Sequence, residues 1–338
     1  MDVTGSTATS SGRRALVVGS VLLLVAAAAG IAVGPGDLGD PELRGTLLAL
    51  RAWRVAAAAL TGAALAVGGA VVQGLFRNPL ADPSILGSTA GASLGGQAAL
   101  ALYAMWLTGG DAGPLPPGAL LPVGCLLGAL IALGCVLAIA RREPDRVVLL
   151  LSGFILTALF LAIGNFLLSM AQESWELGRA MVSFVMGGLS GTGGDQVRAA
   201  APLVLAGIAA AWFWGPSLDL LLSGDEESRS LGVDVAGVRR WGIVWVAVLT
   251  GAAVSLGGNI GFVGLVVPHA LRPYTGWEHR PLLPAAAVAG AAFVVACDVL
   301  TRVVPTRTEL PLGVITGLIG APIFLWMLLR SYREVVHE

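Results

Sequence analysis

Long apolar segments dominate the chain and constrain its fold more than any other feature. A helix needs about 20 apolar residues to cross the roughly 30 Å hydrocarbon layer of a bilayer, because each residue adds about 1.5 Å. Since 56% of the 338 residues are apolar and only 12% are charged, we expect an all-α integral membrane protein. About ten transmembrane helices are predicted, at 15–33, 52–76, 86–107, 119–140, 147–169, 197–214, 241–257, 260–270, 282–302 and 310–329.

Two short tails, 1–14 and 331–338, flank the predicted transmembrane domain at 15–330. Within this domain, the cluster Gly257-Gly258-Asn259-Ile260-Gly261 interrupts a longer apolar stretch. Irregular backbone survives at membrane depth only where neighbouring protein shields it. We expect the chain to reverse there, between a full-length helix and a short one.

Two hydrophilic interruptions are long enough to form surfaces of their own. The first, 170–196, contains an apolar patch and is expected to hold a short external helix. The second, 215–240, is expected to form two short cytoplasmic helices separated at Gly232. Acidic residues begin this loop and Arg239-Arg240 end it, as the helix dipole favours. Such a loop can bind a soluble partner.

The arginine residues give the predicted helices an orientation. Short loops rich in arginine tend to stay on the cytoplasmic side of a membrane. When the N-terminus is placed inside, most of the 20 basic residues fall on the cytoplasmic side. The protein is therefore expected in a bacterial cytoplasmic (inner) membrane, crossing it several times, with both termini in the cytoplasm.

Charge and cysteine usage exclude several classes of function. The net charge is −1, so no basic surface is expected to attract nucleic acid. All basic residues are arginine, and a Walker A phosphate-binding loop requires lysine, so any ATP is hydrolysed by another chain and this one is not expected to be an enzyme. The three cysteines stand alone in apolar runs, so no metal or other cofactor is expected.

The most specific string of residues is Q-G-L-F-R-N-P-L-A-D-P-S-I-L-G, from Gln73 to Gly87. Pro79 and Pro83 cannot continue a helix, Arg77 marks the cytoplasmic boundary, and Gly87 allows the next helix to begin nearby. Many other sequences would form such a hairpin, so this particular order of residues carries further information.

This string resembles the FecCD family of ABC transporter permeases, which includes the importers of vitamin B12, haem and ferric siderophores. Further strings in the same order extend the resemblance over nearly the whole chain, at 261–272, 278–284, 309–317 and 320–324. The resemblance implies the type II ABC importer permease fold. It also implies a second permease copy or paralogue, two cytoplasmic ATPase subunits and an external substrate-binding protein as partners.

The resemblance assigns the 215–240 loop to coupling with the ATPase subunits. Leu231-Gly232-Val233 matches the family's usual sequence at this point, whereas Glu227 and Ser228 stand where small residues are usual. The residues expected to carry the coupling contact are Asp225, Glu226, Arg229, Leu231 and Gly232.

On the external side, Arg51, Arg54 and Arg302 match arginines that the family presents to carboxylates of the binding protein. Arginine suits this role because its forked guanidinium pairs with a carboxylate through two hydrogen bonds. The alternative is that these side chains only extend from helix ends to the membrane–water interface. Trp53 replaces the proline that is common between the first two.

The fifth predicted helix is expected, by the resemblance, to line the substrate path. Its polar exceptions are Ser152, Thr157, Asn165 and Ser169. Such a mostly apolar lining suits an iron chelate, haem or a corrinoid and does not distinguish among them. The family strings near the cytoplasmic surface are expected to form a gate or structural motif, and no metal site; they contain Arg77, Asn78, Pro79, Pro268 and His269.

An ion-coupled secondary transporter of a small organic substrate is the main alternative. Such a transporter usually places an acidic residue at mid-membrane depth. Asp298 is the only plausible acid near a predicted helix interior, and it lies about one turn from Arg302. No set of nucleophile, base or metal ligands suggests an intramembrane enzyme.

A possible inverted repeat links the two halves of the chain. Gly62-Ala63-Ala64 followed by Gly68-Gly69 recurs as Gly251-Ala252-Ala253 followed by Gly257-Gly258. The two helices are predicted to run in opposite directions, as inverted repeats of transporters do. Small residues are common in membrane helices, so coincidence is an equal alternative.

Overall fold

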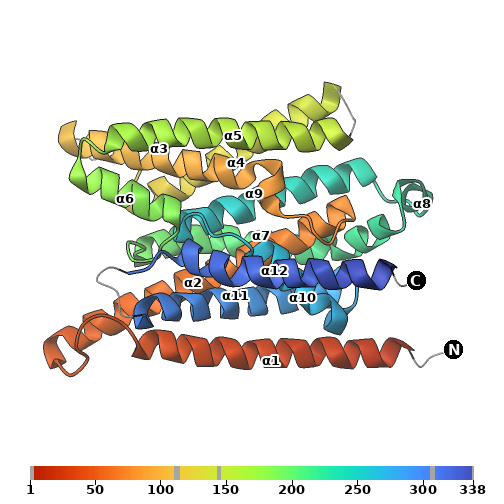
Figure 1. Cartoon of the computed structure of the whole chain (residues 1–338), viewed down its shortest axis with the longest axis horizontal. Coiled ribbons are helices and arrows are strands. Elements are labelled where there is room, and N and C mark those ends of the chain that lie inside the picture. Colours follow the sequence, from red (N-terminus) through yellow and green to blue (C-terminus); the bar gives the residue numbers. More distant parts are fainter. Residues whose placement is uncertain (1–3, 110–114, 143–145, 305–308, 337–338) are drawn as a thin grey trace.

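The computed structural model describes residues 4–109, 115–142, 146–304 and 309–336, and in these ranges every regular element is a helix (Figure 1). The described residues form twelve α-helices and one short 3-10 helix, η1. Their bounds are α1 Thr4–Ala32, α2 Pro41–Phe76, η1 Pro83–Leu86, α3 Ser88–Gly109, α4 Pro117–Arg142, α5 Arg146–Ala171, α6 Trp175–Met186, α7 Gly194–Leu222, α8 Asp225–Ser230, α9 Val235–Gly257, α10 Val263–Thr275, α11 His279–Val303 and α12 Leu312–Val336.

The ten predicted transmembrane segments each coincide with one of these helices. Eight helices are long and apolar enough to cross a membrane, namely α1, α2, α4, α5, α7, α9, α11 and α12. The two remaining helices that coincide with predicted segments are α3, which packs along α4, and the short α10. The count of ten is therefore approximate, because α10 has only 13 residues and covers part of the membrane depth.

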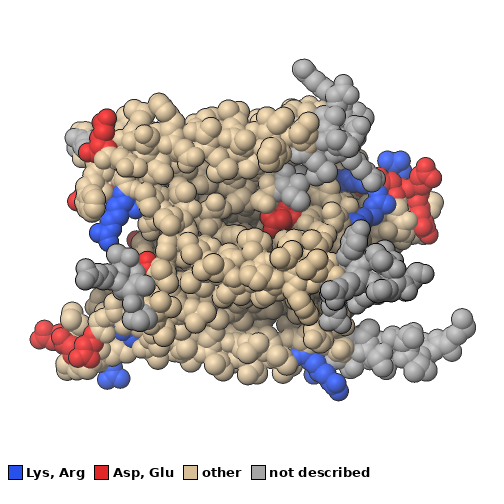
Figure 2. Space-filling model, viewed as in Figure 1, with Lys and Arg blue, Asp and Glu red and all other residues tan. Residues whose placement is uncertain are grey.

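Both termini and α8 lie at one end of the bundle, which we call the inner end (Figure 1). The opposite, outer end carries α6 and the connection between α1 and α2. On the face shown in Figure 2, charged side chains gather at these two ends, and the band between them is almost uncharged apart from one acidic patch. A band of this kind is what a protein that crosses the hydrocarbon layer requires. The inner end is the one that the arginine distribution predicts to be cytoplasmic.

Helix α2 forms the centre of the bundle. Its spanning window is 83% buried, whereas the windows of α1, α5 and α12 are only 11–17% buried. Around α2 lie α7, α9, α10 and α11. The three exposed helices turn apolar side chains outward, so lipid or another protein must cover them.

Glycine lets the central helices approach closely. A Cβ atom on Gly62 of α2 would collide with the carbonyl oxygen of Gly290 on α11. Another on Gly69 would collide with the carbonyl oxygen of Gly264 on α10. Because lipid gives helices little hydrophobic drive to associate, such close van der Waals packing stabilises a membrane bundle.

The chain reverses at 258–262, as predicted. Helix α9 rises from the inner end to Gly257, which lies beside Thr61 of α2. Gly258 and Phe262 both have positive φ, at 67°, and α10 then returns to the inner end, where Thr275 lies beside Gly12 of α1. Helices α2 and α9 pack together and run in opposite directions. The inverted repeat itself stays a prediction.

Two boundaries differ from the sequence-based expectation. Helix α7 continues to Leu222 despite Pro216, so the loop before α9 covers 223–234 rather than 215–240. The second short helix expected after Gly232 is instead the first turn of α9, which begins at Val235. A proline in a membrane helix is tolerated because neighbouring helices can compensate for the lost hydrogen bond, and this kept α7 intact.

The central packing predicts the effect of adding one methyl group. Gly62→Ala should force α2 away from α11 and destabilise the protein by about 1–3 kcal/mol, as overpacking does. Gly45→Ala in the same helix is the matched control, because a Cβ there meets no other atom within 4 Å. The expected result is a lower Tm in detergent for the first variant only. Equal Tm values would contradict the role of this contact.

Candidate functional site

A buried carboxylate organises the outer end of the bundle. Asp298 of α11 is fully buried and accepts a hydrogen bond from Arg54 Nε at 3.0 Å. Its other oxygen pairs with Arg302, one turn further along α11. Arg54 also donates to both carboxylate oxygens of Glu309, at 2.9 and 3.1 Å. Two arginines and two acids thus neutralise one another where α2, α11 and the segment before α12 meet.

Arginine side chains also fix the outer end of α1. Arg51 of α2 is 6% exposed and donates to five backbone carbonyls, at 2.8–3.1 Å. Arg302 donates to the carbonyls of Gly30 and Val33. The last carbonyls of a helix have no hydrogen-bond partner within the helix and carry partial negative charge. A guanidinium supplies both hydrogen-bond donors and positive charge. The five acceptors of Arg51 are Ile31, Ala32, Gly34, Pro35 and Gly36.

The structure therefore gives Arg51, Arg54 and Arg302 partners within the chain. Their guanidinium groups face α1, Asp298 and Glu309 instead of standing free at the surface. Docking of a binding protein on these three arginines stays a prediction. Sequence reasoning placed Asp298 within about one turn of Arg302, and the structure pairs their side chains.

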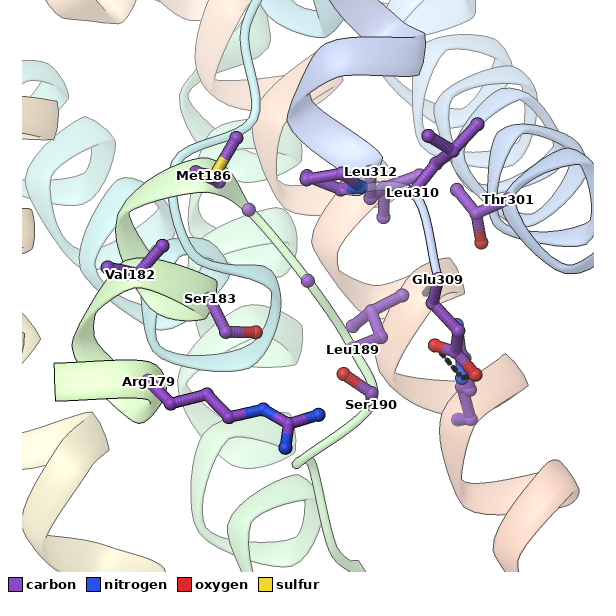
Figure 3. Close-up of a pocket in the computed structure, with 14 residues that line it drawn as sticks. Arg179, Val182, Ser183, Met186, Leu189, Ser190, Thr301, Glu309, Leu310 and Leu312 are labelled. Atoms are coloured by element: carbon purple, nitrogen blue, oxygen red, sulfur yellow. Dashed lines mark hydrogen bonds and ion pairs between the residues drawn. The ribbon is translucent and has the colours of Figure 1, made fainter. Parts of the chain in front are cut away.

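A pocket of about 530 Å³ opens beside this network (Figure 3). One wall is formed by α6, with Arg179 and Ser183, and by the following segment with Ser190; Glu309 lies on the opposite wall. The backbone N–H of Leu312 donates to the carbonyl of Gly187 at 2.7 Å, which joins the start of α12 to the end of α6. Arg179 is exposed and has no acidic partner among the described residues.

At the inner end, Asp225 joins α8 to two other helices. Its Oδ1 accepts hydrogen bonds from Arg77, at 2.6 Å, and from Arg239, at 2.8 Å. Arg77 ends α2 in the left-handed conformation, with φ 51°, and Arg239 lies in the first turns of α9. The contact holds the short α8 against the bundle.

The tip of this inner loop is open to solvent. Glu226, Arg229 and Gly232 are exposed, and Leu231 is 58% exposed. Ser228 is buried and donates to the carbonyl of Leu220 at 2.7 Å. Ser228, which departs from the family's usual sequence, therefore forms a hydrogen bond that stabilises the loop. Of the five predicted coupling residues, Asp225 faces inward and the other four form the exposed tip.

The predicted motif residues lie together near the inner end. Asn78 Oδ1 accepts from the N–H of Leu80 at 2.9 Å, which shapes the turn after α2. Pro268 is buried within α10, and His269 lies near the backbone of Pro79. No group of three or more metal-ligating residues occurs in the described part of the chain.

The four predicted path residues share α5 but differ in environment. Asn165 and Ser169 are exposed, Ser152 is buried, and Thr157 donates to the carbonyl of Gly153 at 2.8 Å. Together with many exposed apolar residues of α5, the first two face outward from this single copy. The path itself stays a prediction, since a second copy would have to complete it.

Sequence reasoning missed a further cavity of about 230 Å³ and its acidic residue, Asp82. The 79–87 segment was expected to be a hairpin after the cytoplasmic boundary at Arg77, and in the structure Pro83 packs against Gly68 of α2 and Gly264 of α10. Asp82 lines the cavity with Asn259 and Thr89. Proline and glycine mark a turn equally well at the surface or inside the membrane, so no sequence signal distinguished the two.

Removing the buried carboxylate tests the outer network. Asp298→Asn leaves the buried Arg302 without an acidic partner and Arg54 with Glu309 alone, so we expect a loss of about 3–5 kcal/mol in stability, measured as a lower Tm in detergent. Asp195→Asn is the control, because its pair with Arg198 is largely exposed and should contribute little. A change in Asp298→Asn no larger than in the control would contradict the structural role.

A substitution of the same kind tests Asp225 at the inner end. Asp225→Asn weakens both arginine contacts, so amide hydrogen exchange across 225–234 should become faster. Glu226→Gln removes a neighbouring exposed charge and should leave that exchange unchanged. Equal protection in both variants would show that the ion pairs do not hold α8.

Comparison with known proteins agrees with this architecture. The model of the FecCD transport family matches residues 11–330. The cobalamin import system permease protein BtuC of Halobacterium salinarum is 42% identical over 297 residues, covering 87% of this chain and 76% of that protein. The hemin transport system permease protein HmuU of Yersinia pestis is 37% identical, covering 85% of this chain and 84% of that protein.

Structural similarity extends over the same length. A solved structure described as an inward-facing conformation of a metal-chelate type ABC transporter superimposes with a TM-score of 0.80 at 28% identity, covering 94% of this chain and 99% of that chain. The Fe(3+) dicitrate transport system permease protein FecD of Escherichia coli is 36% identical, covering 84% of this chain and 85% of that protein. With a family model matched almost throughout, the chain belongs to the FecCD transport family.

Proposed function

We propose that the chain is the permease subunit of an ATP-driven importer that moves an iron chelate, haem or a corrinoid across the cytoplasmic membrane. The observation that carries this proposal is the match to permeases of such importers over nearly the whole chain. The fold supports it, because a bundle of membrane helices presents a short solvent-exposed helix, α8, at the inner end.

In this proposal the chain has no catalytic site of its own. Two ATPase subunits bind at the inner loop, an external binding protein delivers the cargo at the outer end, and a second permease copy or paralogue completes the path. Binding of ATP to the partners shifts the permease between outward-open and inward-open states. The exposed helices α5 and α12 offer the apolar surface that a second copy would cover.

The buried ion pairs argue against Asp298 as the ion-carrying acid of a secondary transporter. An acid that carries an ion must release and rebind it during each cycle. Asp298 is instead fully buried between two arginines, and Arg54 links it to Glu309. Its geometry supports a structural role.

Reconstitution tests the proposal directly. The permease, its ATPase and its binding protein are placed in liposomes, and uptake of cyanocobalamin, haemin and ferric dicitrate is measured with ATP inside. We expect uptake of one of these cargoes to require ATP and both partners. Uptake by the permease alone, lost when the ion gradient is removed, would overturn the proposal.

Coupling can be tested at Gly232. Its φ of 84° suits glycine, and a Cβ there would meet no other atom within 4 Å, so Gly232→Val strains the backbone of the loop without a clash. We expect ATP hydrolysis to continue with at least about ten-fold less uptake per ATP, because the loop no longer follows the ATPase movement. Gly45→Ala serves as the control, and a normal uptake ratio in Gly232→Val would exclude this loop from coupling.

The three predicted docking arginines are unsuitable for a charge-reversal test of binding to the external partner. Reversing Arg51, Arg54 or Arg302 would disturb folding and docking together, because each has partners inside the chain. Arg179 is exposed at the pocket of the outer end and has no acidic partner in the part of the chain that the structure describes. We propose it as an additional contact for a carboxylate of the binding protein.

A further inference from the structure

We propose that Asp82, Asn259 and Thr89 form a polar subsite halfway across the membrane, which binds a cationic or hydrogen-bond-donating group of the transported chelate. The inference rests on the proposed function. It concerns the 230 Å³ cavity between α2, η1 and the reversal at 258–262.

The depth of this cavity follows from α2. Arg54 marks the outer end of the uncharged part of α2, and Arg77 marks its inner end. Leu65, which lines the cavity, lies almost midway between them in the sequence. At about 1.5 Å per residue, Leu65 is roughly 16–18 Å from either arginine along the helix axis. The cavity is therefore near the middle of the hydrocarbon layer.

Two irregular segments from different halves of the chain meet at this depth. Pro83 at the start of η1 packs against Gly68 and Gly264, so the segment after α2 turns back into the membrane. The reversal at 258–262 forms the facing wall. Non-helical backbone at membrane depth is tolerated where protein buries it or where it lines a water-filled cavity.

The polar groups in this cavity lack protein partners. One oxygen of Asp82 accepts from the N–H of Ser84 at 2.8 Å, and the other has no partner among the described residues. The side-chain amide of Asn259 and the hydroxyl of Thr89 likewise have none in the described part of the chain. An ionisable group at this depth is costly and usually faces a functional cavity.

The chemistry of the lining selects the ligand group. An ionised carboxylate only accepts hydrogen bonds, whereas an amide and a hydroxyl can also donate. Among the described residues that line the cavity there is no arginine to neutralise Asp82. The subsite therefore favours an ammonium, an amide N–H or a metal-bound water. Its volume is below that of ordinary ligand pockets, so it takes one group of a larger cargo.

The cavity also adjoins both the outer pocket and the predicted path. The carbonyl of Asn259 lies beside Gly187, which lines the outer pocket, so the reversal separates the two spaces. On the other side, Gly87 at the end of η1 packs beside Thr157 of α5. A cargo that moves from the outer pocket along α5 would pass this subsite.

Thiol reactivity tests the subsite without knowledge of the cargo. The three native cysteines are replaced by alanine, Asn259→Cys is introduced, and the full chain is reacted in nanodiscs with aminoethyl and sulfonatoethyl methanethiosulfonate. A carboxylate concentrates cations near it. The ratio of the reaction rate with the cationic aminoethyl reagent to the rate with the anionic sulfonatoethyl reagent should therefore fall at least about ten-fold on adding Asp82→Asn. This variant retains an oxygen that can accept from Ser84, and Asp195→Asn is the control for an exposed acid.

Thr89→Cys provides a second reporter if the first position does not tolerate cysteine. An unchanged rate ratio on adding Asp82→Asn would overturn the subsite. Absence of reaction with both reagents at both positions would also overturn it, because the cavity would then be closed to the path.

Transport distinguishes a group of the chelate from a free inorganic cation. In the complete complex, Asp82→Asn should lower uptake of the transported cargo at least about ten-fold, without a lower Tm, and Asp82→Glu should restore much of it. An Asp82-dependent response of uptake to sodium or proton gradients at constant ATP would assign the site to a free cation and overturn the proposal. If the wild-type complex transports none of cyanocobalamin, haemin and ferric dicitrate, the proposed function fails, while the thiol test still decides the charge preference of the cavity.

Discussion

Close contact between backbones at glycine is the constraint on which the rest of this structure depends. Helix α2 is surrounded by other helices, and at Gly62 and Gly69 the neighbouring chains approach its backbone directly. In lipid, helices gain little from hydrophobic association, so stability comes from such packing and from satisfied polar groups. The two irregular segments, 79–87 and 258–262, can enter the membrane because this central helix supports them.

Charged residues in the bundle divide into two kinds. Asp298, Arg54 and Arg302 neutralise one another and hold the outer ends of α1, α2 and α11 together. Asp82 has no charged partner in the described residues and faces a cavity. The first set stabilises the fold, whereas an unpaired acid at mid-depth has a physical reason to persist only where water or cargo reaches it.

The inner loop joins a small exposed surface to the bundle. Asp225 ties α8 to the ends of α2 and α9, so the segment that carries the exposed tip at Leu231 is held against two central helices. The outer pocket is joined to the reversal in a similar way, since Leu312 bonds to Gly187 and Gly188 bonds to Gly257. These links connect both ends of the protein to the segments around the mid-depth cavity.

The sequence by itself determined the membrane class, the positions of ten helical segments and the reversal near Gly258. These follow from local properties, because the length of an apolar run and the placement of glycine act within a few residues. The motif strings likewise established the family. Only the tertiary structure decided that Arg51 satisfies the end of α1, that α7 continues to Leu222, and that Asp82 lines a cavity beside α2 and the reversal. Each of these depends on a neighbour distant in sequence: a set of carbonyls, a compensating helix, or a glycine that allows Pro83 to approach.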